Sequence, residues 1–507
     1  MYETMQGVRG LLVAGTTSDA GKSVVTTALC RWLAREGVRV APFKAQNMSN
    51  NSMVTADGAE IGRAQWVQAV AARAEPEAAM NPVLLKPGSD LRSHVVVMGR
   101  PHSDLDARSF GSARTDLAEA AFAALDDLAR RYDVVVCEGA GSPTEINLRE
   151  HDFVNMGLAR HAGLPVLVVG DIDRGGVFAA FHGTVALLCA EDQALVAGFV
   201  VNKFRGDRDL LAPGLAAIGR ATGRPVLGVL PWLADQWLDS EDALDVAPRR
   251  DPGLAPGVET LHVAVVRFPR ISNFTDVDAL AAEPGVVVRF TAHPAEVADA
   301  DLAVLPGTRA TVADLRWLRE RGLDEAVRGR AAAGRPTLGI CGGYQMLARE
   351  IVDEVEARVG AVPGLGLLPA QVRFTVDKVL GRPAGEAYGS RVGTAYAIHH
   401  GRVSVVEGDT AEPFLDGCRV GAVWGTSWHG ALEDNEFRRS FLREVAAMAG
   451  RDRFVVAPDT DFAALREHRI DLLADAVVEH LDTPALRQFI DDGPPTGLPF
   501  VPPGAPD

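Results

Sequence analysis

The sequence predicts an α/β protein with two domains, each built on a mainly parallel sheet. Three observations support this prediction. The chain has 507 residues, which is more than a single hydrophobic core usually accommodates. Short apolar runs alternate with longer amphipathic stretches in two series, separated by a segment of acids and prolines. Each series also contains a glycine-rich turn between an apolar run and a helical stretch.

The first series occupies residues 8–230 and predicts a parallel sheet with helices on both faces. Its apolar runs are short enough for strands, and Ala-rich helical stretches lie between them, for example at 24–35 and 117–130. Strand followed by helix, repeated along the chain, places successive strands in parallel. We expect strands at 10–14, 38–43, 133–137, 164–170, 197–201 and 225–230.

The second series begins at residue 261 and predicts a second α/β unit. Strands are expected at 261–268, 285–290, 302–305 and 336–340, and the pattern beyond about residue 365 favours β-structure followed by a helical tail. The predicted division of the chain is a first domain at 1–235, a linker at 236–260, a second domain with its helical tail at 261–490, and a mobile Pro/Gly-rich end at 491–507.

Composition and charge argue against several classes of protein. The formal net charge of −16 disfavours nucleic acid as a partner, because the phosphate backbone is repelled. The five cysteines are scattered without metal-ligand spacing, which is typical of a reducing compartment. No signal peptide or long apolar span is found, so we expect a cytoplasmic protein without a membrane partner. The oligomeric state stays open, and a homo-oligomer is compatible with the sequence.

The first glycine-rich turn is GTTSDAGKS, Gly15 to Ser23, and it predicts a nucleotide site. Five residues separate Gly15 from Gly21, where the common phosphate-binding loop has four, and Thr16 stands in place of the first glycine. A plain strand-to-helix turn would also use glycine, but Lys22 followed by a hydroxyl residue has a more specific use. Loop N–H groups, from Thr16 to Gly21, hold phosphate oxygens of ATP, Lys22 reaches the β- and γ-phosphates, and Ser23 binds Mg²⁺.

Polar residues follow the other strands of the first series, at the edge where parallel sheets bind ligands. Glu138 is expected to bind Mg²⁺, because this cation prefers carboxylate oxygen, and Glu60 is a second acidic candidate. Lys44 is expected to neutralise a substrate carboxylate that attacks the γ-phosphate. Each residue alone could be an ordinary loop residue, and only their convergence on one edge favours a site. The remaining candidates are Asn202 for the adenine edge, and Lys203 and Arg205 for an anionic acceptor.

The second glycine-rich turn is GICGG, residues 339–343, and it predicts a nucleophilic cysteine. Small neighbours permit the sharp turn that exposes a nucleophile, and the helix N-terminus favours the thiolate of Cys341. A buried structural cysteine is the simpler alternative, which the flanking glycines disfavour. A base is also required. His429 in GTSWHG is the predicted base, and His399 and His400 are its rivals.

These two turns resemble those of two known families. The lengthened loop is similar to that of the dethiobiotin synthetase group of P-loop enzymes, which implies ATP-dependent activation of a carboxylate. The second turn, together with His429, resembles class I glutamine amidotransferases. That resemblance implies Cys341 as the nucleophile and His429 as the base. It also implies contacts to glutamine or to the oxyanion from Gln345, Gly342 and Gly307.

The chain departs from the amidotransferase pattern at one position. Many members have a glutamate two residues after the histidine, and here that place is Ala431, with Glu433 nearby but out of register. The resemblance therefore implies the subgroup that works with a Cys–His dyad. It leaves open which residue orients His429.

The domain order and four further motifs resemble the cobyric acid synthase family from about residue 8 to residue 490. The motifs are NMSNNS, EINL, GDIDRGGVFA and VNKFRGD. This resemblance implies amidation of carboxylates b, d, e and g of adenosylcobyrinic acid a,c-diamide to give adenosylcobyric acid, with ATP, Mg²⁺ and glutamine and through an acyl phosphate. Two alternatives stay open: a cobyrinic acid a,c-diamide synthase, and a regulatory P-loop ATPase with an inactive glutaminase domain.

Overall fold

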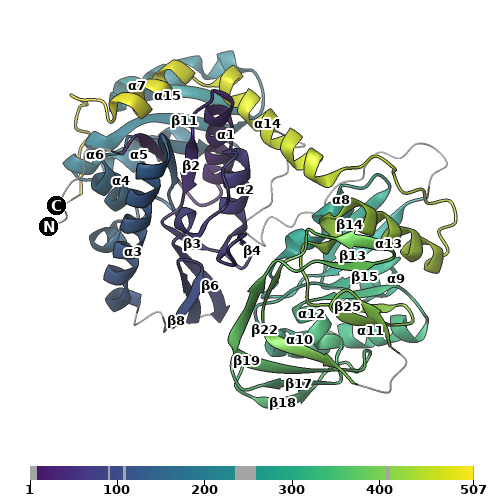
Figure 1. Cartoon of the computed structure of the whole chain (residues 1–507). Coiled ribbons are helices and arrows are strands. Elements are labelled where there is room, and N and C mark those ends of the chain that lie inside the picture. Colours follow the sequence, from purple (N-terminus) through teal and green to yellow (C-terminus); the bar gives the residue numbers. More distant parts are fainter. Residues whose placement is uncertain (1–7, 90–91, 107–109, 234–258, 407–410, 506–507) are drawn as a thin grey trace.

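A computed structural model describes residues 8–89, 92–106, 110–233, 259–406 and 411–505 of the chain. These residues form two α/β domains, and helix α14 (Phe462–His480) leads from the second domain back to the first (Figure 1). Both domains have the helix-covered, mainly parallel sheet that the sequence predicts. The predicted linker at 236–260 lies outside the described residues as far as residue 258.

The first domain contains a six-stranded sheet in which every pair of neighbouring strands is parallel. All six strands predicted from the sequence are present, with ends that differ by a few residues. Because the strands are parallel, their carboxyl ends lie at one edge of the sheet. In sheet order the strands are β12 (Val226–Pro231), β11 (Val196–Phe204), β10 (Val166–Asp171), β1 (Gly10–Gly15), β9 (Val134–Glu138) and β2 (Val40–Phe43).

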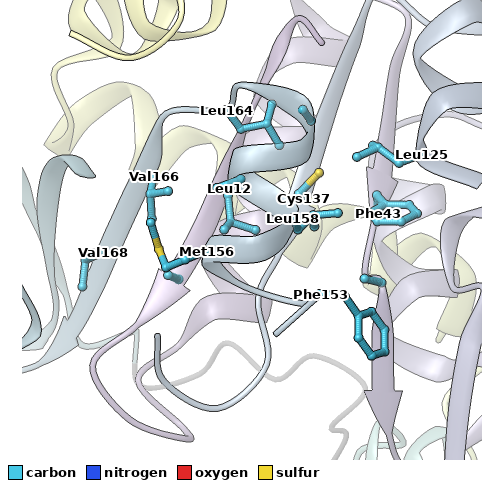
Figure 2. Close-up of a cluster of buried hydrophobic side chains, with 14 of the residues drawn as sticks. Leu12, Phe43, Leu125, Cys137, Phe153, Met156, Leu158, Leu164, Val166 and Val168 are labelled. Carbon is cyan, nitrogen blue, oxygen red and sulfur yellow. The ribbon is translucent and has the colours of Figure 1, made fainter. Parts of the chain in front are cut away.

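Helices cover both faces of this sheet, because successive residues of a strand point to opposite sides. In β1, Leu12 packs into the cluster shown in Figure 2, whereas Leu11 and Val13 pack on the opposite face. The helices on the Leu12 face are α3 (Phe110–Arg131), α4 (Met156–Ala162), α5 (Val177–Ala186), α6 (Ala190–Leu195) and α7 (Ala212–Thr222). Those on the opposite face are α1 (Lys22–Arg35), α2 (Arg63–Ala71), α14 and α15 (Thr483–Asp492).

The helical tail thus packs on the first domain, which differs from the predicted division of the chain. Leu473 and Val477 of α14 and Ile490 of α15 join the core beside α1. Arg31 of α1 also donates to Glu467 of α14 at 2.5 Å. Apolar periodicity reveals that a helix has a face to bury but not which partner covers it. The sequence therefore predicted the tail helices correctly and their location wrongly.

The stretch after α15 also contacts the first domain, although its prolines and glycines led us to expect a mobile end. Val501 is 4% exposed. Its N–H donates to Gln193 Oε1 at 2.8 Å, and its carbonyl accepts from Gln193 Nε2 at 2.9 Å. Arg224 donates to Pro499 O at 2.5 Å. Two buried polar side chains therefore hold this stretch in place.

Between β2 and α3 the chain inserts a region that the sequence analysis did not recognise. A two-stranded hairpin of β4 (Ser52–Val54) and β5 (Glu60–Gly62) leads directly into α2. Met53 and Val54 of this β4–β5 hairpin pack against residues of the second domain, Tyr396 and Ile398. Beside the hairpin lies a four-stranded sheet in the order β3 (Gln46–Met48), β6 (Val83–Ser89), β7 (Arg92–Val97) and β8 (Arg100–Asp106).

The second domain contains a seven-stranded sheet whose first five strands are parallel. The four strands predicted at 261–340 are present and adjacent. In sheet order the strands are β14 (Val286–Thr291), β13 (Leu261–Val266), β15 (Leu302–Leu305), β16 (Thr337–Ile340), β25 (Val423–Thr426), and the antiparallel β24 (Gly417–Val420) and β23 (Glu412–Phe414).

Helices again form layers on both faces of the second sheet. One face is covered by α8 (Asp278–Ala281) and α13 (Asn435–Met448), and the other by α9 (Pro294–Asp299), α10 (Thr311–Glu320), α11 (Leu323–Ala332) and α12 (Gly342–Leu347). The β-structure expected beyond residue 365 is present, and it begins earlier than predicted, at residue 350. One sheet contains β17 (Glu350–Asp353), β18 (Gly360–Pro363), β19 (Ala370–Gly381) and β22 (Ala397–Val405), and β20 (Gly385–Ala387) forms a hairpin with β21 (Ser390–Val392).

Candidate active sites

The loop at 15–22 joins β1 to α1 with a geometry that needs glycine at its last turn. Gly21 has φ 101°, a left-handed backbone that side chains disfavour. A Cβ there would also lie 2.0 Å from Asn202 Nδ2. Asn202 donates from that nitrogen to Ala20 O at 3.0 Å, so it braces the loop from β11. The N–H of Thr16 donates to Val169 O at 2.9 Å, which continues the pairing of β1 with β10.

Lys22, the first residue of α1, folds back over this loop. Its Nζ donates to Thr17 O at 3.1 Å and to Gly141 O at 3.0 Å. Gly141 belongs to the turn that follows β9, so the ammonium group lies between the loops of two neighbouring strands. A cation in this position, next to the N–H groups of a helix start, suits the phosphates of a nucleotide.

Glu138, at the end of β9, is the centre of a buried polar cluster. Its Oε1 accepts from Ser23 Oγ and from Lys44 Nζ, each at 2.8 Å, and its Oε2 accepts from Gln68 Nε2 at 2.5 Å. Burial alone would raise the pKa of Glu138, but Lys44, Gln68 and Ser23 hold it below its usual range. The carboxylate therefore stays charged. Glu138 and Ser23 offer adjacent hard oxygen donors beside the loop, which fits Mg²⁺.

Glu60, the second predicted metal ligand, is bound elsewhere. Its Oε1 accepts from Lys86 Nζ at 2.7 Å and from Ser52 Oγ at 2.9 Å, and its Oε2 pairs with Lys378 Nζ at 2.5 Å. Both of its oxygens are thus engaged by ammonium groups, from two lysines that the sequence analysis did not connect with it. Its role as a metal ligand stays a prediction.

Lys203 and Arg205 follow β11 at the same edge as the loop. Lys203 Nζ donates to Asp171 Oδ2 at 2.9 Å and to Asp19 O at 2.7 Å, which links β10, β11 and the loop. The Arg205 guanidinium lies 3.8 Å from the ring centroid of Trp232, and its side chain is 57% exposed. Both residues lie at the predicted edge of the sheet, and the Arg205 guanidinium forms an exposed ion pair with Asp173 Oδ1 at 3.3 Å. Contact with an acceptor remains a prediction.

In the second domain, Cys341 stands on the sharp turn between β16 and α12. Its backbone has φ 49° and ψ −109°, which is strained for a residue with a side chain. Close packing explains the glycines around it: a Cβ at Gly343 would lie 1.9 Å from Leu305 O, and one at Gly339 would lie 2.8 Å from Tyr344 N. The turn is therefore built to hold the cysteine in this conformation.

His429 interacts electrostatically with Cys341 and contacts a carboxylate that the sequence analysis missed. Its Nδ1 lies 2.7 Å from Asp276 Oδ2, and Asp276 Oδ1 accepts from Gly430 N at 2.8 Å. Burial alone would lower the pKa of His429, but Asp276 and Cys341 raise it to about 10. Cys341, His429 and Asp276 thus form a nucleophile–base–carboxylate constellation. The structure thus places Asp276 beside the dyad implied by the resemblance, and the catalytic roles of these residues stay a prediction.

The rival histidines have other partners. His399 Nδ1 lies 2.8 Å from Gly401 O, and His400 Nδ1 lies 3.1 Å from Thr375 O. Burial lowers the pKa of His399 to about 4 and lowers that of His400 as well. Both rings therefore stay neutral at pH 7, whereas the charge of Cys341 raises the pKa of His429.

The predicted oxyanion and glutamine residues surround this constellation. A Cβ at Gly307 would lie 2.9 Å from His429 Cε1, and one at Gly342 would lie 3.0 Å from Thr308 N. The loop at 306–308 therefore approaches both the base and the start of α12. Gln345 is 2% exposed and accepts from Thr311 Oγ1 at 2.9 Å, so it lies behind the turn. Its contact with glutamine stays a prediction.

For Asp276 the sequence carried no usable signal, whereas for the lysines it did. Asp276 lies 153 residues before His429, so no local spacing could connect them. The lysines carry a clearer signal, because the chain has 51 basic residues but only five lysines. Three are around the nucleotide loop and two hold Glu60. These five are Lys22, Lys44, Lys203, Lys86 and Lys378.

The fold and the two sites define a class of protein: a P-loop nucleotide-binding domain followed by a glutamine amidotransferase domain. Residues 11–242 match the family described as the CobQ/CobB/MinD/ParA nucleotide binding domain, and residues 262–437 match the CobB/CobQ-like glutamine amidotransferase domain. None of the helices in the described ranges has the length and apolar character needed to cross a membrane.

Three curated relatives narrow this class to one family, and each is named cobyric acid synthase. The chain is 63% identical to the protein of Streptomyces avermitilis, over 98% of the chain and 99% of that protein. It is 63% identical to that of Mycolicibacterium gilvum and 62% identical to that of Mycobacterium tuberculosis, over 98% of the chain and 100% of each relative. The chain belongs to the cobyric acid synthase family.

Proposed function

We propose that the chain catalyses the ATP- and glutamine-dependent amidation of carboxylates b, d, e and g of adenosylcobyrinic acid a,c-diamide, giving adenosylcobyric acid in cobalamin biosynthesis. The observation that carries the proposal is the presence, in one chain of this family, of a Cys341–His429–Asp276 constellation and a Ser23–Lys22–Glu138 nucleotide site. The first supplies ammonia and the second activates the carboxylate that receives it.

Ammonia comes from glutamine at Cys341. Its sulfur attacks the side-chain carbon of the glutamine amide, and His429 gives a proton to the departing ammonia. The N–H groups of the 306–308 loop and of Gly342 stabilise the oxyanion of the tetrahedral intermediate. Water then cleaves the thioester to release glutamate. Asp276 holds the His429 ring in the orientation that both steps require.

Carboxylate activation takes place at the carboxyl edge of the first sheet. Lys22 neutralises charge on the β- and γ-phosphates of ATP, and Lys44 draws the attacking carboxylate towards the γ-phosphorus. Mg²⁺, held by Ser23 and Glu138, would offset the negative charge of the phosphates. An acyl phosphate forms as ADP leaves, and ammonia then displaces phosphate to give the amide. One such centre serves all four carboxylates if the product is released between rounds.

The amidation products test the assignment directly. With adenosylcobyrinic acid a,c-diamide, ATP and glutamine, we expect mass spectrometry to detect mono-, di- and tri-amidated intermediates before the tetra-amidated product. Amidation of unamidated cobyrinic acid at only the a and c positions would assign the chain to the a,c-diamide synthases. Failure to release glutamate from glutamine would instead favour the regulatory ATPase.

Acceptor binding is expected to depend on Arg205. Two polyanions repel each other, so a protein of net charge −16 needs local positive charge where a polycarboxylate binds. Arg205→Ala is expected to raise the KM for the corrinoid by about tenfold, since a charge-assisted contact is worth on the order of 1.5 kcal/mol. Steady-state kinetics with Arg220→Ala as the surface control measures this. An unchanged KM, or an equal loss of glutaminase activity, would contradict the role.

A further inference from the structure

The β4–β5 hairpin is tied to both domains by one buried carboxylate. Glu60 is fully buried and joins Ser52 and Lys86 of its own domain to Lys378 of the second domain. Burial alone would raise the pKa of Glu60, but Lys378 and Lys86 hold it well below its usual range. The carboxylate therefore stays charged. Removal of this carboxylate would leave two lysines without it in the interior, which is destabilising, so the ion pairs favour the docked position of the hairpin.

From this position, the hairpin contacts the segment that carries Asp276. Ser52 N–H donates to Asn273 Oδ1 at 3.0 Å, and Asn273 is 4% exposed. Asn273 has a left-handed backbone, with φ 48°, and precedes the 3-10 turn η5 (Phe274–Val277). Asp276 N–H donates to Asn273 O at 3.1 Å. The location of Asn273 therefore sets that of Asp276, three residues later.

A second contact reaches the face of the His429 ring. Tyr396 stacks on this ring, with centroids 5.3 Å apart, and exchanges two backbone hydrogen bonds with His429 at 2.9 and 3.0 Å. On the first-domain side, Tyr396 packs in a cluster with Met53 and Val54 of β4. Strand β4, which contacts Asn273 through Ser52, therefore also packs against Tyr396, the residue that stacks on His429.

A third contact follows His429 in the chain. Glu433, at the end of the 3-10 turn after Gly430, pairs with Arg63 of α2 at 2.7 Å and with Arg466 of α14 at 2.9 Å. Arg63 comes directly after the hairpin and is 1% exposed. Glu433, which is out of register for a catalytic role, therefore connects the segment after His429 to the first domain.

We propose that Ser52–Arg63 of the first domain positions the Asp276–His429 pair, so that glutamine hydrolysis in the second domain requires the docked hairpin. Asn273 and Glu433 are then positioning residues, which act through Asp276 and His429 and do not touch glutamine. The inference rests on the proposed glutaminase role of Cys341. Three independent contacts converge on one histidine, and small displacements of such a group cost large factors in rate.

Asn273→Gly tests the proposal, because glycine keeps the left-handed backbone and removes only the acceptor for Ser52. In the full chain, kcat for glutamate release is expected to fall on the order of tenfold, with KM for glutamine little changed. Amidation driven by free ammonia should be retained. Arg73→Gly makes the same change at an exposed left-handed position, φ 54°, at the end of α2, and should behave as wild type.

The pH profile separates positioning from a general loss of structure. The charged or titratable groups facing His429 are Asp276, Cys341 and His399. If Asn273→Gly lets Asp276 move away, the alkaline limb of kcat/KM for glutamine should shift to lower pH. An unchanged kcat and pH profile would overturn the proposal, and so would an equal loss with glutamine and with ammonia.

Glu433→Gln offers a second variant that preserves the side-chain shape. It should lower glutamate release in the same direction, and Glu436→Gln, an exposed change on α13, should not. Wild-type glutaminase activity in Glu433→Gln would also count against the proposal.

Cys341→Ala distinguishes a failure of the positioning proposal from a failure of the proposed function. If Cys341→Ala is inactive with glutamine while Asn273→Gly is normal, the positioning proposal fails and the proposed function stands.

Discussion

Lys22→Ala is expected to abolish amidation with either nitrogen donor, while glutamate release from glutamine continues. Lys22 Nζ lies between the carbonyls of Thr17 and Gly141, where the loops of β1 and β9 meet. A cation there stabilises charge on the transferred phosphoryl group, and its loss costs about 10²–10³ in rate or more. Formation of adenosylcobyric acid from ammonia and from glutamine should therefore fall together.

The matched control is Arg35→Ala, at the other end of the same helix. Arg35 forms an exposed ion pair with Asp475, and such pairs contribute about 0–1 kcal/mol. Arg35→Ala also removes one positive charge from α1, but it should leave amidation unchanged. Amidation by Lys22→Ala within about threefold of wild type would show that the lengthened loop does not act on the phosphates, because a charge in the transition state cannot be removed at so small a cost.

The elements of the two sheets were predictable because their signals are local. Each strand is a short apolar run. The turns at Gly21 and Cys341 are recognisable from their glycines, which the backbone needs for left-handed or crowded conformations. The edge of the first sheet was predictable for the same reason. Parallel strands bring their carboxyl ends together, and so Lys44 and Glu138 meet although 94 residues separate them.

Contacts between elements were less predictable, because any of several partners would satisfy the same pattern of apolar residues. The apolar face of α14 could have packed on either domain, and the alternation in the sequence does not distinguish them. Glu60 has the charge of a metal ligand, but two buried lysines from different domains engage it. Asp276 could not be predicted for the same reason. Its distance from His429 is fixed by the tertiary fold, which brings η5 next to the end of β25.

Asp276→Asn is expected to lower kcat/KM for glutamine hydrolysis by on the order of 10³ to 10⁴. Loss of the carboxylate from a nucleophile–histidine–carboxylate triad leaves the ring in the wrong tautomer and removes the charge that stabilises the imidazolium. Asp276 accepts from both His429 and Gly430, so the amide would also disturb the backbone contact. Ammonia-driven amidation should be retained, because the nucleotide site is on the other domain.

The same variant should change the pH dependence with a defined sign. Asp276 raises the pKa of His429, which reaches about 10, so the imidazolium that we propose as the proton donor to ammonia persists well above pH 7. Without the carboxylate that pKa falls, and the alkaline limb of kcat/KM for glutamine moves to lower pH. Asp324→Asn makes the same chemical change in the first turn of α11, where the side chain is not buried, and serves as the control. If Asp276→Asn keeps both the rate and the profile of wild type, then Cys341 and His429 act as a dyad, and Asp276 is a structural neighbour whose charge the reaction does not use.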